Sequence, residues 1–355
     1  MNEFKKPFVA YTPGEEGLDL VRFDPESGEM RDVKNGEPEG VLVPGFVDIH
    51  IHGAYGIDMM TADKEEYDDL LEQLSQDGYE RLLPTTVTAS AEDVKRFIHN
   101  LPSHPMIGGF HLEGPFISPQ FPGAQPQEFI IDPESAGPEW DEILNHPKLK
   151  IVTIAPEVPG ALSLIKFLTK RKVVVSMGHT NATYEEAKLA HDAGMLHSTH
   201  TFNAMRGLHH REAGALGAAM TLTPFRAELI YDRIHVSPEA ALLLIQARLV
   251  DGQVVGVSDS TMASGLEPGT KLTMWGLDCV VGEGDVRLQS NGSLAGSAVT
   301  LRSVFENLTE DFGVEVAADC CCYAPREALG MKSHPKVWNL VEEETGALIQ
   351  TFKVD

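Results

Sequence analysis

The chain has 355 residues, 42% of them hydrophobic and 23% charged, and its formal net charge is −25. This composition predicts a globular protein, long enough for one large α/β domain with an appendage or for two ordinary domains. The negative charge argues against partners that bind through a basic face, so we expect no nucleic-acid and no membrane partner. A few local cations and backbone N–H groups can still hold one anionic small substrate.

Cysteine usage and the first residues predict a cytoplasmic location. Cys279 and the run Cys320, Cys321, Cys322 match neither a disulfide framework nor a CxxC metal spacing. We interpret the run as small apolar helix residues in a reducing compartment. The opening segment MNEFKKPFVAYTPGEEG lacks the apolar region of a signal peptide, and no apolar stretch has the length of a membrane span.

Both ends of the chain predict short strands rather than helices. The first 43 residues are interrupted by the turn signals GEEG, DPESG and KNGEPEG, and the tail KVWNLVEEETGALIQTFKVD predicts a strand pair around a glycine turn. We therefore expect a small β-sandwich domain built from residues 1–43 and 331–355, beside a main domain of residues 44–330.

Between these ends, short apolar runs alternate with segments of helical periodicity. Several helical segments begin at an N-cap residue such as Ser90, Thr183 or Ser237, and two end at Gly78 and Gly194. Strands that alternate with helices form a parallel sheet, and eight such units predict an α/β fold of the (β/α)8 TIM-like barrel type, with a doubly wound sheet as the alternative. The eight predicted strands are Gly45–His52, Leu82–Thr88, Met106–Glu113, Lys150–Pro156, Val173–His179, Met195–Asn203, Ala227–Val236 and Val254–Asp259.

Six side chains that can bind a metal fall at the carboxyl ends of five predicted strands, where barrel enzymes place their active sites. His50 and His52 are two residues apart on one strand, so they point to the same side. Each residue alone also fits a structural role, but their common rim favours a metal site of Zn, Fe or Mn. Six ligands exceed what one tetrahedral site needs, which favours a binuclear centre that activates water for attack on an amide or ester carbonyl. The six are His50, His52, Glu113, His179, His200 and Asp259.

Seven motifs between about Pro44 and Gly330 carry a family resemblance. They are PGFVDIHIHG, GFHLEGPF, VSMGHTNA, STHTFNAM, REAGALGAAM, DRIHV and SLAGSAVTL, in this order. On these motifs the chain resembles the amidohydrolase superfamily and, within it, the family of N-acetylglucosamine-6-phosphate deacetylases. The resemblance implies a homodimer that hydrolyses the N-acetyl amide of N-acetylglucosamine 6-phosphate to glucosamine 6-phosphate and acetate, with one or two divalent metal ions per subunit.

Three alternatives stay open at this point. The nearest keeps the chemistry and changes the sugar, for example to N-acetylgalactosamine 6-phosphate. Another is a different amidohydrolase, such as a cyclic amidase or a nucleoside deaminase, although a neutral substrate would need no phosphate-binding residues. The third is a non-catalytic scaffold, which would be expected to have lost ligands or the base.

The resemblance also implies roles for single residues. Glu113, His179 and His200 match the main metal ligands, and His50 and His52 match the ligands of the second metal. Asp259 matches the general base, which takes a proton from water and returns it to the departing amine, and it also reaches a metal in binuclear members. The positions that match substrate contacts are Ala124, Asn203, Ala204, Arg211, His235 and a loop over the sugar formed by Leu294, Ala295, Gly296 and Ser297. In a family dimer, one phosphate contact comes from the neighbouring subunit.

Two departures from the family pattern stand out. Gln125 occupies a substrate-side position where many members have a histidine that polarises the acetyl carbonyl. We hypothesise that a second metal ion takes over this role, so that Gln125 and the His50/His52 pair occur together. The tail lacks a longer glycine-containing ending, which predicts a reduced terminal domain, and His209 and His210 match no metal position.

Overall fold

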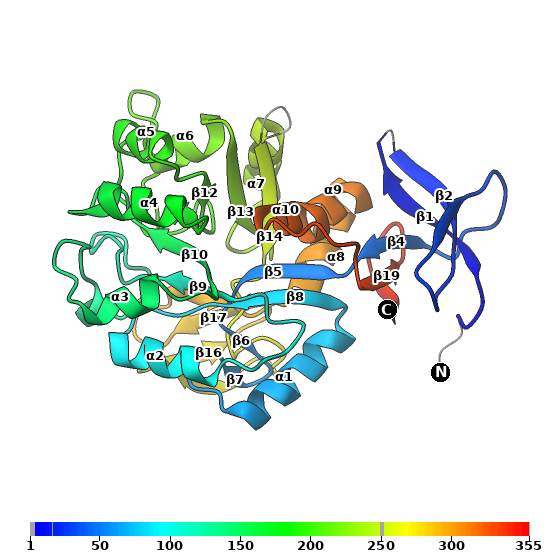
Figure 1. The fold of residues 1–355 in the computed structure, drawn as a ribbon, viewed down its shortest axis with the longest axis horizontal. Coiled ribbons are helices and arrows are strands. Elements are labelled where there is room, and N and C mark those ends of the chain that lie inside the picture. The colour runs from blue at the N-terminus through cyan, green and yellow to red at the C-terminus, as the bar shows by residue number, and fades with distance from the viewer. Residues whose placement is uncertain (1–3, 16, 249–251, 355) are drawn as a thin grey trace.

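The computed structural model describes residues 4–15, 17–248 and 252–354, and its two termini meet in one six-stranded sheet. Figure 1 shows this sheet to one side of the rest of the chain. Aromatic side chains fill its core, where the rings of Phe8, Phe23 and Phe352 lie 5.4–5.7 Å apart. The expected β unit made from both termini is therefore present, as a single sheet among the described residues. Its strands, in spatial order, are β20 (Leu348–Lys353), β19 (Val337–Val341), β4 (Val41–Pro44), β1 (Phe8–Gly14), β2 (Gly17–Phe23) and β3 (Met30–Asp32).

Eight parallel strands form the main part of the molecule, and each overlaps the run predicted for it. Six of them make a curled sheet, and β5 pairs with β8 beside it. Isolated bridges from Thr85 to His111 and from Ile51 to Ser260 link the pair to both ends of the curled sheet. The predicted parallel α/β architecture is confirmed. The strands are β5 (Phe46–Ile51), β8 (Tyr79–Pro84), β9 (Phe110–Glu113), β10 (Leu149–Ile154), β11 (Val174–Met177), β12 (His197–Ser198), β13 (Phe225–Ile230) and β14 (Gly252–Val257), with a small hairpin of β6 (Gly53–Ala54) and β7 (Ile57–Asp58) after β5.

Helices follow the strands and lie around the outside of the sheet (Figure 1). The three predicted N-caps act as such: the hydroxyls of Ser90, Thr183 and Ser237 accept hydrogen bonds from the main chain of the first turn. The three consecutive cysteines are buried and free, in a π-helical turn at Asp319–Tyr323. Within the described ranges, none of the helices has the length and apolar character needed to cross a bilayer. The helices are α1 (Lys64–Gln76), α2 (Ala91–Asn100), α3 (Glu139–Leu144), α4 (Ala161–Lys170), α5 (Tyr184–Asp192), α6 (Gly214–Thr221), α7 (Pro238–Arg248), α8 (Leu301–Phe312), α9 (Val314–Ala318) and α10 (Ala324–Ala328).

A four-stranded antiparallel sheet, not predicted from the sequence, follows β14. Its strands are β15 (Lys271–Met274), β16 (Leu277–Val281), β17 (Asp285–Leu288) and β18 (Leu294–Ser297). The expectation that residues 294–297 form a loop is wrong, because the ladder with β17 makes them a strand. The short LAGS segment carries a glycine and too little apolar alternation to predict a strand by itself. Tertiary packing stabilises the strand instead, because its residue Ala295 belongs to the same buried apolar cluster as Met274, Cys279 and Val286.

A buried ion pair ties the main sheet to the segment that leads into β19. Glu80 on β8 lies 2.6 Å from the Arg326 guanidinium on α10, and both side chains are less than 8% exposed. Arg326 also donates to the carbonyl of Ser333, and the N–H of Lys336 donates to Glu80. These hydrogen bonds hold both charged groups in the interior. Removing one partner would leave the other charge buried and unpaired.

We expect Arg326→Ala to lower the free energy of unfolding by about 3–5 kcal/mol, the usual cost of breaking a buried pair. Arg31→Ala is the matched control, because Arg31 pairs with Glu29 on the surface, and we expect it to cost less than about 1 kcal/mol. Urea unfolding followed by circular dichroism measures both changes. Equal shifts for the two variants would contradict the structural role assigned to Glu80 and Arg326.

Candidate metal centre

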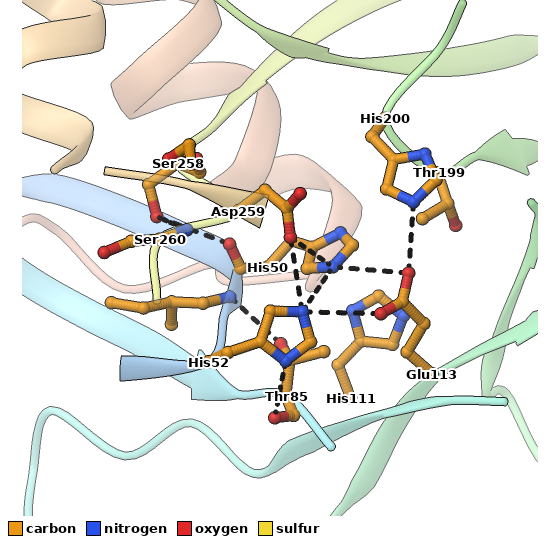
Figure 2. A network of polar contacts seen from close by, with 12 residues as sticks. His50, His52, Thr85, His111, Glu113, Thr199, His200, Ser258, Asp259 and Ser260 are labelled. Carbon is orange, nitrogen blue, oxygen red and sulfur yellow. Dashed lines mark hydrogen bonds and ion pairs between the residues drawn. The ribbon is translucent and has the colours of Figure 1, made fainter. Parts of the chain in front are cut away.

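Glu113 ends β9 and lies between two pairs of imidazoles, as Figure 2 shows for His50, His52 and His200. One carboxylate oxygen, Oε1, is 3.1 Å from His200 Nε2 and 3.2 Å from His179 Nε2. The other oxygen, Oε2, is 3.4 Å from His52 Nε2. One carboxylate therefore contacts both pairs.

Asp259, just after β14, completes the group around His50 and His52. Its Oδ1 is 3.3 Å from His50 Nε2 and 3.2 Å from His52 Nε2. All six predicted ligands are thus brought together, and each is at most 8% exposed. Their donor atoms form two sets that could each hold a metal ion, one of His50, His52 and Asp259, the other of Glu113, His179 and His200.

The hydrogen bonds of the imidazoles show that this donor set fits a metal. Nδ1 of His52 faces the carbonyl of Thr85 and Nδ1 of His179 faces the carbonyl of Phe121, and a carbonyl can only accept, so each Nδ1 carries the proton. In the neutral form of each ring, the opposite Nε2 atom is then a lone pair. Two such pairs of Nε2 atoms face each other, His179 with His200 at 3.1 Å and His50 with His52 at 3.3 Å. Two facing lone pairs repel each other. Ligands about 2.0–2.1 Å from one tetrahedral zinc ion stand about 3.3 Å apart, so a cation bound by both nitrogens would remove this repulsion.

Unusual backbone conformations aim several of these side chains. His179, His200 and Asp259 have φ values of 44°, 30° and 47°, and Ala204 beside them has 47°. Residues with side chains rarely adopt such values, and they persist where surrounding bonds hold them. The N–H of Asp259 donates to the carbonyl of His50, and the carbonyl of Asp259 accepts from the N–H of Ser297. Ser297 on β18 therefore helps to hold the loop of Asp259.

The electrostatics of the centre favour a cation. Burial alone would raise the pKa of Glu113 and of Asp259, but the nearby imidazoles, His50 foremost, hold both pKa values below their ordinary range. Burial would lower the pKa of His52, yet hydrogen bonds to Asp259 and Glu113 raise that pKa to about 9. The ionised carboxylates thus attract positive charge strongly, whether that charge is a proton on an imidazole or a metal ion.

A cavity of about 150 Å³ opens onto these ligands. Seven of the predicted substrate residues line it: Ala124, Gln125, Asn203, Ala204, His235, Leu294 and Gly296. Ala295 and Ser297 do not, because on β18 they are buried beneath it. Gly123 and Gly296 have positive φ, and a Cβ on Gly296 would lie only 2.5 Å from the Thr261 side chain, so only glycine fits there.

Gln125 is held between the main chain and a metal ligand. Its Nε2 donates to Glu113 Oε2 at 2.8 Å, and its Oε1 accepts from the N–H of Thr88 at 2.7 Å. The sequence placed Gln125 where relatives polarise a carbonyl. In the structure its amide contacts the carboxylate that lies between the two ligand sets.

Arg211 lies outside the cavity lining. It is exposed, with its guanidinium 2.6 Å from the His210 imidazole. His235 does line the cavity, and Asp232 lies 2.6 Å from its Nδ1. None of the described residues that line this cavity is a lysine or an arginine.

Two residues near the centre were missed by the sequence analysis. Trp275, in the turn between β15 and β16, lines the cavity, and its ring centroid is 5.5 Å from that of His52. Glu228 on β13 is fully buried, and its carboxylate lies 3.0 Å from His50 Nδ1. The sequence could have indicated Glu228, because a carboxylate inside the apolar run FRAELI is unusual. Trp275 gave none, because its sheet was not predicted.

Comparison with known proteins places this centre in a family. The profile described as the amidohydrolase family matches residues 41–333, most of the chain. The chain belongs to the amidohydrolase family. Members of similar sequence include N-acetylglucosamine-6-phosphate deacetylase of Bacillus subtilis (strain 168), 36% identical over 77% of this chain and 70% of that protein. N-acetylgalactosamine-6-phosphate deacetylase of Escherichia coli O157:H7 is 34% identical over 83% of this chain and 77% of that protein.

Solved amidohydrolase structures are also similar. N-acetyl-D-glucosamine-6-phosphate deacetylase from Mycobacterium smegmatis superposes with a TM-score of 0.87 at 27% identity, covering 98% of each chain. N-acetylglucosamine-6-phosphate deacetylase from Thermotoga maritima gives a TM-score of 0.85 at 30% identity, covering 98% of this chain and 97% of that one. The fold and the metal-competent cluster are thus those expected of an amidohydrolase.

We expect removal of divalent cations to lower the melting temperature of this amidohydrolase, because buried carboxylates lose their counter-charge. A ligand present at 100 times its Kd stabilises by about 2.7 kcal/mol, so the shift should be several degrees and should reverse when Zn²⁺ or Mn²⁺ is added back. Thermal unfolding with and without chelator measures it. His52→Ala should show a smaller chelator effect, whereas His209→Ala, exposed and outside the cavity lining, should behave like the unaltered protein. A melting temperature that the chelator does not change would refute the metal centre.

Proposed function

We propose that the chain is a metal-dependent deacetylase of N-acetylglucosamine 6-phosphate, which releases glucosamine 6-phosphate and acetate in amino-sugar catabolism. The observation that carries the proposal is the double ligand set joined by Glu113 at the wall of a cavity. That cavity is also lined by Asn203, Ala204 and His235, the residues that match sugar-phosphate contacts. The names of the similar proteins in Bacillus subtilis and Mycobacterium smegmatis support the reaction and the substrate class.

We assign one divalent cation to Glu113, His179 and His200, and a second to His50, His52 and Asp259. Zn, Fe or Mn suits this mixture of imidazole and carboxylate. The cations would polarise the substrate carbonyl and make water acidic enough to attack it. The charge of the buried groups supports two ions, because Glu113, Asp259 and Glu228 are all buried and all have pKa values held below the ordinary range. A single divalent cation would compensate two of these three negative charges and leave one.

We assign proton transfer to Asp259. Its Oδ1 faces His50 and His52, and Asp259 itself lines the cavity in which the substrate would lie. The carboxylate takes a proton from water as the new C–O bond forms. It returns that proton to the nitrogen as the C–N bond breaks, so acetate and a free amine leave.

For the phosphate we assign Asn203, the backbone N–H of Ala204, His235 and Arg211. Asn203 offers a buried Nδ2 without a hydrogen-bond partner. Arg211 is exposed and outside the lining of its own cavity, which supports a homodimer in which this arginine reaches the phosphate bound by the neighbouring subunit. A guanidinium suits this task because it forms paired bonds to oxyanions.

The finer architecture belongs to the same proposal. We infer a closed (β/α)8 barrel over residues 44–330, supported by the bridges Thr85–His111 and Ile51–Ser260 at its two seams. We infer that residues 1–43 and 331–355 form a terminal β domain of their own, supported by the single six-stranded sheet to which both ends contribute strands. Four free, buried cysteines support a reducing, cytoplasmic location.

A second candidate substrate is N-acetylgalactosamine 6-phosphate. The Escherichia coli O157:H7 relative that is named for this substrate matches a larger share of the chain than the Bacillus subtilis relative does. The two sugars differ in the configuration of one hydroxyl group, so the metal chemistry and the phosphate contacts serve either.

An acetate-release assay tests the function directly. The panel holds N-acetylglucosamine and N-acetylgalactosamine, each with and without the 6-phosphate. We expect kcat/KM at least about 100-fold higher for the phosphorylated sugars, since a charge-assisted phosphate contact contributes about 1.5–3 kcal/mol and several are present. Among these, we expect N-acetylglucosamine 6-phosphate to react faster. Equal turnover of plain and phosphorylated sugars would refute the phosphate site, and preference for the galactosamine compound would establish the second candidate.

Asp259→Asn should lower kcat by about 10²–10⁴-fold, the usual contribution of a general base, because an amide cannot accept the proton. Metal content, measured by elemental analysis, should stay close to that of the unaltered protein, since the amide oxygen can still face the cation. Asp278→Asn is the control: Asp278 lies exposed on β16 and should leave kcat unchanged. Full activity of Asp259→Asn would exclude Asp259 as the base.

A further inference from the structure

Glu228 is a buried carboxylate that contacts both ligand sets from behind. It lies on β13 with 0% of its surface exposed. Its Oε2 is 3.0 Å from His50 Nδ1 and accepts the main-chain N–H of His200, also at 3.0 Å. Its Oε1 is 3.2 Å from His197 Nε2. His50 and His200 belong to different ligand sets.

Toward His50, the contact fixes which ring nitrogen is free. An ionised carboxylate only accepts, so His50 Nδ1 donates to Glu228, and Nε2 of the neutral ring is left as a lone pair. That Nε2 points at His52 and Asp259. A carboxylate behind a metal-binding histidine also raises the basicity of the imidazole and holds its ring in place.

Toward His200, the contact holds the backbone. The φ of 30° at His200 is sparsely populated, and the bond from its N–H to Glu228 stabilises this conformation. The next N–H, of Thr201, donates to the main-chain carbonyl of Glu228 at 2.9 Å. Glu228 therefore holds the turn that presents the His200 imidazole to Glu113.

We propose that Glu228 is a positioning residue that couples the two ligand sets, so that losing its carboxylate weakens cation binding at both. The proposal rests on the metal centre proposed above. It concerns binding in the absence of substrate, so it can fail while the deacetylase reaction stands. Equally, a protein that binds two cations but releases no acetate would refute the reaction alone.

Glu228→Gln is a suitable probe because the site can accommodate an amide. The amide oxygen can accept from His50 and His200, and the amide N–H can donate to His197 Nε2. His197 then carries its proton on Nδ1, which is buried without a hydrogen-bond partner in the structure. The variant keeps the volume and the hydrogen bonds and removes the negative charge. Glu228→Asp is the complementary variant, since it keeps the charge and withdraws the carboxylate by one methylene.

The experiment is a chelator competition that counts Zn²⁺ bound per chain as free Zn²⁺ is lowered. We expect Glu228→Gln and Glu228→Asp to raise the apparent Kd of both cations by about 10–100-fold, the usual effect of losing an outer partner of a metal-bound histidine. Each is then repeated in a His50→Asn background, which retains the Glu113 set. There we expect the Glu228 substitution still to weaken the remaining cation, through the backbone of His200.

The control is Glu80→Gln, a buried carboxylate on β8 that pairs with Arg326. We expect it to lower stability and to leave Zn²⁺ affinity unchanged. Wild-type affinities in both Glu228 variants would overturn the proposal. So would an effect that disappears in the His50→Asn background, because Glu228 would then serve His50 only. An equal loss of affinity in Glu80→Gln would overturn it too, since the cause would be general destabilisation.

Discussion

The whole site depends on one electrostatic constraint: negative charge is buried where water cannot solvate it. Glu113, Asp259 and Glu228 are at most 8% exposed, and five imidazoles contact them. Burying an unpaired carboxylate is costly, so positive charge must lie beside these groups, as protons on the imidazoles or as metal ions. Divalent cations would supply that charge and would also relieve the contacts between facing nitrogens. The arrangement of the chain therefore favours a metal, as its membership of the amidohydrolase family does.

The parallel strands make this constraint possible. Each ligand is placed at or just beyond the carboxyl end of a strand, so residues as distant in sequence as His50 and Asp259 meet at one rim. The N–H of Asp259 donates to the carbonyl of His50, which holds the Asp259 loop against β5. The antiparallel sheet of β15–β18 adds Trp275 and Leu294 to the wall of the cavity. A rigid sheet therefore supplies the ligands, and an inserted sheet completes the pocket.

Much of the fold and of the ligand set could be predicted from the sequence. Apolar runs between capped helices gave the eight strands, and the strand ends gave the six residues that the structure brings together, because periodicity and caps are local signals. The sheet of β15–β18 could not be predicted, since its strands are short and Leu294–Ser297 become a strand only through pairing with β17. Likewise Gln125 was placed at the substrate, and its contact with Glu113 depends on a loop conformation that no local pattern encodes. Arg211 lies outside the cavity of its own chain. We propose that it completes the site of a neighbouring subunit, which the sequence of one chain could not place.

The most direct test of the central claim is the number of divalent cations bound per chain in the purified protein, measured by elemental analysis against a protein concentration from amino-acid analysis. Compensation of the buried carboxylates predicts two cations per chain, both lost on exhaustive chelation and both regained on adding back the metal. A chain that is fully active with one cation, or that binds none, would contradict the account.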